Sequence, residues 1–68
     1  MMSKDEILKM FYSRLAEIQH YQREDTDMIG TNTYEVVLIE LELLYNILGE
    51  DVPEEYWEQT EDALYFNC

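Results

Sequence analysis

Closely spaced carboxylates stand out in the last third of the sequence. Five acids lie between positions 54 and 62: Glu54, Glu55, Glu58, Glu61 and Asp62. On an α-helix they would span about 12 Å, or roughly one charge per 2.4 Å, whereas duplex DNA carries one negative charge per about 1.7 Å of its axis. A protein surface that holds phosphates could therefore accept these carboxylates. The predicted partner-binding residues are these five acids together with their neighbours Glu50, Asp51 and Tyr65.

The charge of the whole chain is distributed unevenly. The formal net charge is −12, and residues 24–68 contain 13 of the 16 acids but no Lys or Arg. The four basic residues all lie in the first 23 positions: Lys4, Lys9, Arg14 and Arg23. A surface of one sign repels nucleic acid and anionic membranes, so we expect neither as a direct ligand, and it favours a basic protein as the partner. The competing interpretation is that the charge only keeps a small helical protein in solution.

Other reactive residue types do not form a recognisable site. Asp25–Gly30 resembles the start of a calcium-binding loop, but Ile29 and Val36 occupy positions that need oxygen ligands. His20 is the only histidine, and no nucleophile stands beside a base in a known motif. Cys68 is the only cysteine, which excludes an intrachain disulfide, and its acidic surroundings should suppress the thiolate. We therefore expect no metal, no cofactor and no enzymatic activity.

The first element that must position these residues is an amphipathic helix. Ser3 and Glu6 form a capping-box pattern that predicts its start, and the helix should run to about Arg23. Its apolar residues fall within an arc of about 140°: Ile7, Leu8, Phe11, Tyr12, Leu15 and Ile18. The polar stretch 24–31, which contains Gly30, predicts a loop.

A second helix should begin with Asn32 as its N-cap and end at Gly49. It is apolar on two sides. One face contains Tyr34, Val37, Leu38, Leu41, Leu44, Tyr45 and Leu48, and the other contains Val36, Ile39, Leu43 and Ile47. Such a helix is either covered by its neighbours on both sides or buried in a homodimer, and the pattern fits both. The alternation of apolar and acidic residues within 34–43 also allows a strand, which would make the fold α+β.

A third helix should start near Asp51–Glu54, where Pro53 is tolerated in a first turn. Its apolar face would contain Tyr56, Trp57, Thr60, Ala63 and Leu64, with the acids on the other face. Tyr65 and Phe66 fall on the acidic side. The predicted fold is therefore an all-α three-helix bundle formed by a single acidic domain, residues 1–68.

These features predict a small protein that binds and inhibits a basic, nucleic-acid-binding protein, as a DNA mimic or antirepressor carried by a phage or mobile element would. One alternative is an immunity protein or antitoxin that neutralises a cationic toxin without mimicry. Another is an adaptor that binds through Val36, Ile39, Leu43 and Ile47. The N-terminus lacks the pattern of a signal peptide and no uncharged stretch is long enough to cross a bilayer, so we expect a cytoplasmic location.

Overall fold

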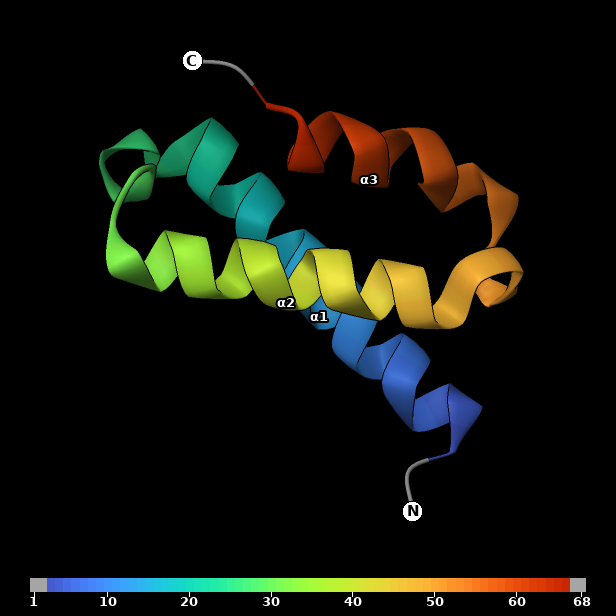
Figure 1. Ribbon diagram of the computed structural model, residues 1–68. Coiled ribbons are helices and arrows are strands. Elements are labelled where there is room, and N and C mark those ends of the chain that lie inside the picture. The colour runs from blue at the N-terminus through green and yellow to red at the C-terminus, as the bar shows by residue number, and fades with distance from the viewer. Residues whose placement is uncertain (1–2, 67–68) are drawn as a thin grey trace.

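The computed structural model describes residues 3–66, which form three α-helices (Figure 1). The helices are α1 (Lys4–Glu24), α2 (Asn32–Leu48) and α3 (Trp57–Leu64), and no strand occurs within residues 3–66. The all-α prediction is confirmed, and the alternative that placed a strand at 34–43 is wrong. This segment is helical because it is a 17-residue run rich in Leu and Glu with a cap at each end. These features favour a helix more than the short alternation of apolar and acidic residues favours a strand.

Helix α1 begins and ends close to the predicted positions. The Ser3 hydroxyl accepts a hydrogen bond from the Glu6 backbone N–H at 3.2 Å and donates to the Glu6 carboxylate at 3.3 Å. The helix ends at Glu24, one residue beyond the expected end. A 3₁₀ turn, η1 (Thr26–Met28), lies inside the stretch predicted as a loop.

The predicted N-cap of α2 is wrong by one residue. Thr31, and not Asn32, is the cap: its hydroxyl accepts from the Tyr34 N–H at 3.3 Å and donates to the Met28 carbonyl at 2.6 Å. The second hydrogen bond ties the cap to η1, which explains the choice between two cap-forming neighbours. At the other end, Gly49 has the expected positive φ of 54°, and its N–H donates to the Tyr45 carbonyl.

The third helix begins later than predicted. Two 3₁₀ turns, η2 (Gly49–Asp51) and η3 (Glu54–Tyr56), precede α3, which starts only at Trp57. Pro53 accounts for the delay because proline pushes the residue before it out of the α region, and Val52 is indeed extended. Val52 is also buried, which anchors this connection in the core.

The core lies where α2 crosses α1, and α3 lies alongside α2 (Figure 1). The buried apolar side chains come from all three helices and from the connection before α3: Phe11, Leu15, Ile18, Tyr34, Val37, Leu41, Leu44, Leu48, Val52 and Ala63. Thr60 is buried with them, and its hydroxyl donates to the Tyr56 carbonyl. Contrary to its predicted place on the apolar face of the third helix, Trp57 is 40% exposed and lies outside the buried core. Tyr65 and Phe66 are exposed, as their positions off the apolar arcs predicted.

Within residues 3–66, none of the helices combines the length and the apolar character that a membrane crossing needs.

Candidate protein-binding surface

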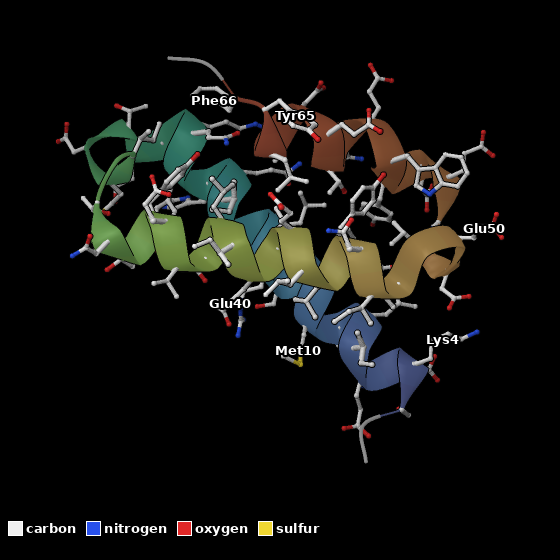
Figure 2. All side chains as sticks on the ribbon, viewed as in Figure 1. Lys4, Met10, Glu40, Glu50, Tyr65 and Phe66 are labelled. Carbon is white, nitrogen blue, oxygen red and sulfur yellow. The ribbon has the colours of Figure 1, made fainter. Side chains whose placement is uncertain are left out.

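The eight predicted partner-binding residues are all exposed, and we call them together the acidic face. They come from three consecutive elements: Glu50 and Asp51 from η2, Glu54 and Glu55 from η3, and Glu58, Glu61 and Asp62 from α3, with Tyr65 directly after it. Oxygen-tipped side chains project from α3 into solvent (Figure 2). Among the large hydrophobic residues of the described range, Tyr65 is the most exposed, at 80%.

The acids of this face are not on one continuous α-helix, contrary to the prediction. Glu58, Glu61 and Asp62 share the side of α3 opposite the buried Thr60 and Ala63. Their Cα atoms span about 6 Å of helix rise, so the mean spacing on α3 alone is roughly one charge per 3 Å. The remaining four acids lie on the two turns before α3, on either side of Pro53. A continuous helical row of charges therefore exists on α3 and not over the whole segment.

Cations of the same chain neutralise little of this face. Two ion pairs occur within residues 3–66: Lys4 Nζ lies 3.5 Å from Asp51 Oδ1, and Arg14 Nε lies 3.5 Å from Glu40 Oε2. Only the first involves the acidic face, so Asp51 is the one predicted binding residue that a cation of the described chain approaches within 4.0 Å. That pair is well exposed, and an exposed pair contributes at most about 1 kcal/mol, so a stronger partner could displace Lys4.

A shallow pocket adjoins the acidic face where the end of α2 meets the start of α3. It has a volume of about 300 Å³ and is lined by Tyr45, Asn46, Gly49, Glu50 and Trp57. The Trp57 indole N–H donates to the Val52 carbonyl at 2.8 Å, and the Tyr45 ring stacks on Phe11 with centroids 6.1 Å apart. Two positioned aromatic rings beside a carboxylate are chemically suited to the alkyl stem and charge of a Lys or Arg side chain.

Sequence reasoning found Glu50 but missed the other four residues that line the pocket. The available signal was Trp57, because an indole N–H next to an acidic run must find an acceptor, which fixes the ring at a defined place. The pocket itself depends on how two helix ends meet around Gly49, and local patterns do not contain that information.

The negative field of the acidic face reaches the pocket. Burial raises the pKa of the Tyr45 hydroxyl above its usual 10.0, and the neighbouring Glu61 and Tyr65 raise it further. Tyr45 therefore stays neutral at physiological pH and serves the pocket as a ring and a hydrogen-bonding hydroxyl. In α1, the hydrogen bond from Tyr21 to Glu17, at 2.8 Å, likewise raises the pKa of Tyr21.

A second surface lies along α2. Val36, Ile39, Leu43 and Ile47, which we call the apolar stripe, are each 56–67% exposed. The alternative that other parts of the bundle cover both apolar faces of α2 is therefore wrong for the described chain. Burial of the stripe in a homodimer, or against another protein, stays a prediction.

Within residues 3–66, no three His, Cys, Asp or Glu side chains are arranged to hold a metal ion. The expectation about the Cys68 thiol concerns a residue outside the described range.

Comparison with known proteins gives no relative. No protein-family model matches the chain, and neither the curated proteins nor the solved structures include a significant match.

Proposed function

We propose that this protein binds a basic, nucleic-acid-binding surface of another protein through its acidic face and thereby blocks it. The observation that carries the proposal is that seven exposed acids line one segment, and only Asp51 among them has a cation of the described chain within 4.0 Å. Charges held close together without compensation repel one another, which opposes folding. A surface that only had to remain in solution would do better with mixed signs.

The charge spacing on α3 supports nucleic-acid mimicry. The spacing of Glu58, Glu61 and Asp62, roughly one charge per 3 Å, differs by less than a factor of two from the roughly 1.7 Å per charge along the axis of duplex DNA. A groove whose Lys and Arg residues are spaced for phosphates can therefore pair with several of these carboxylates at once. Binding of this kind should weaken steeply as salt rises, because each ion pair formed releases bound ions.

The pocket beside Trp57 supplies what the carboxylates lack, namely a defined anchor. Exposed ion pairs contribute little individually, whereas a side chain that packs against aromatic rings is typical of the residues that dominate binding energy. In this proposal a Lys or Arg of the partner lies against Trp57 and Tyr45, with its charge at Glu50. The acids of α3 then set the approach and orientation of the basic surface.

The test is affinity capture from the native host at low salt with three immobilised forms of the protein. The first is the wild type, and the second carries Glu58→Gln, Glu61→Gln and Asp62→Asn. The third carries Asp5→Asn, Glu24→Gln and Asp27→Asn, which removes the same charge from exposed positions outside the acidic face. We expect the wild type and the third form to retain the same basic protein, and the second form to lose most of it.

Equal capture by all three forms would refute the role of α3. Addition of duplex DNA separates mimicry from the alternative of toxin neutralisation. If DNA releases the captured protein, the acidic face occupies a nucleic-acid site. If a basic protein is captured through α3 but DNA does not compete, the immunity-protein or antitoxin interpretation is the correct one.

A further inference from the structure

The apolar stripe on α2 needs a separate explanation. Its four residues, Val36, Ile39, Leu43 and Ile47, recur about once per turn and cover about 16 Å of helix. A single exposed leucine is ordinary on a protein surface, but a continuous row with more than half of each residue exposed marks an interaction site.

One border of the stripe is negative, and an ion pair lies along the other. Glu35 and Glu42 are exposed along one side, and Glu40 lies along the other, where Arg14 of α1 pairs with it. Figure 2 shows Glu40 on the side of α2 that faces Met10 of α1. Helix α2 contains no Lys or Arg at all.

We infer that the stripe is the docking site for an amphipathic helix of another protein whose apolar face is flanked by Lys and Arg. The four apolar side chains stand at positions i, i+3, i+7 and i+11, so they form one row over three turns against which the apolar face of a partner helix can pack. The exposed Glu35 and Glu42 then meet basic residues of the partner. The inference concerns a second surface and does not require the acidic face to bind.

Charge argues against a second copy of this chain as the occupant. In a symmetric pair through α2, each copy would bring the exposed Glu35 and Glu42 to the interface, while neither α2 has a basic residue and Arg14 of α1 is already paired with Glu40. Each copy also has a net charge of −12. Like charges facing one another across an interface oppose association strongly.

The size of the stripe fits one helix. The exposed parts of its four side chains provide on the order of 400 Å² of apolar surface, which is within the range for the largest patch of a monomer. A standard interface covers about 800 Å² per partner, a little more than half of it apolar. The stripe supplies about half of that area, close to the apolar share of such an interface.

The test uses the whole chain and a synthetic amphipathic helix of about 18 residues, long enough to form a helix, with leucine on one face and lysine elsewhere. Titration calorimetry at physiological salt should give one-to-one binding. The double variant Ile39→Gln/Leu43→Gln should bind at least about tenfold more weakly. It keeps the charge and the helix propensity of α2, and because both residues are exposed its melting temperature should hardly change.

Two controls make the result specific. The form with Glu58→Gln, Glu61→Gln and Asp62→Asn should bind the peptide within about threefold of the wild type, since its stripe is intact. A peptide with glutamate in place of lysine should not bind. Failure of this inference is thus distinguishable from failure of the proposed function, which depends on α3.

Several results would overturn the inference. One is equal affinity of the wild type and the double variant, because the peptide would then be held by charge alone. Another is equal binding of the lysine and glutamate peptides. A third is a wild-type dimer at micromolar concentration, seen by sedimentation equilibrium and abolished in the double variant, since a second copy would then cover the stripe.

Discussion

Replacing Asp62 by asparagine should make the protein more stable while it weakens the binding that we propose. Asp62 lies in the last turn of α3, four residues after Glu58, and both carboxylates are exposed. Like charges at this spacing repel each other, and a negative charge near the C-terminus of a helix opposes the helix dipole. The wild-type residue is therefore unfavourable for the fold on two grounds.

The magnitude follows from these two contributions. Removing the like-charge pair with Glu58 should stabilise the fold by about 0.2–0.5 kcal/mol, and removing the charge from the last turn by about 0.3–1 kcal/mol. Aspartate and asparagine have similar helix propensities, so no opposing change is expected from the backbone. The free energy of unfolding should rise by about 0.5–1.5 kcal/mol at low salt, and each kcal/mol raises Tm by roughly 4–8 °C in a domain of this size.

The assay is thermal unfolding followed by circular dichroism, at about 10 mM and at about 1 M salt, where the screening length falls from about 30 Å to about 3 Å. Asp5→Asn is the matched control because Asp5 lies in the first turn of α1, where a negative charge is favourable. The two variants have the same net charge, yet the control should be less stable than the wild type. Both shifts should shrink at high salt. An unchanged or lowered Tm for Asp62→Asn at low salt would refute the reasoning.

Three further predictions concern the rest of the fold. Leu41→Ala should lower the free energy of unfolding by about 2–5 kcal/mol, because Leu41 is fully buried. Leu43→Ala should change it by no more than about 0.5 kcal/mol, because Leu43 is on the exposed stripe. Urea denaturation measures both changes. Gly49→Ala should destabilise by more than about 1 kcal/mol in the same assay, because φ is positive there, and an unchanged midpoint would exclude this role. Burial raises the pKa of Tyr45, and the hydrogen bond to Glu17 raises that of Tyr21, so the folded state holds these protons more tightly than the unfolded chain. The contribution of these protons to the free energy of unfolding should be fully present below pH 10 and should be lost as pH rises beyond it. The fall with pH should be shallower in Tyr45→Phe than in the wild type. Equal falls in the two proteins would contradict a raised pKa of Tyr45 as the cause.

Local patterns predicted much of the fold because most of its determinants are local. The capping pattern at Ser3 and the positive φ of Gly49 depend on the nearest residues, and the arc of Phe11, Leu15 and Ile18 depends on helical periodicity. The two errors in helix starts have different origins. Both Thr31 and Asn32 can cap α2, and the hydrogen bond from the Thr31 hydroxyl to η1 selects Thr31. The late start of α3 follows from the extended conformation that Pro53 imposes on Val52, which the prediction did not take into account.

The candidate surfaces were predictable in part. Exposure of the acids and of Tyr65 follows from composition and periodicity, and so does the existence of a second apolar face on α2. Whether that face is covered depends on where α1 and α3 pack, which only the tertiary structure determines. The same holds for Lys4 reaching Asp51 across 47 positions of sequence, and for the pocket beside Trp57.

The most direct test of the role of the acidic face is whether this protein displaces DNA from the basic protein that it binds. Labelled duplex DNA is bound to the basic protein captured from the host, and fluorescence anisotropy follows its release as this protein is added. We predict full release by the wild type. The affinity of the wild type for the basic protein should fall steeply as salt rises, as expected for ion pairs. The form with Glu58→Gln, Glu61→Gln and Asp62→Asn should require at least about tenfold more protein. If DNA stays bound at saturating wild-type protein, the acidic face does not occupy a nucleic-acid site.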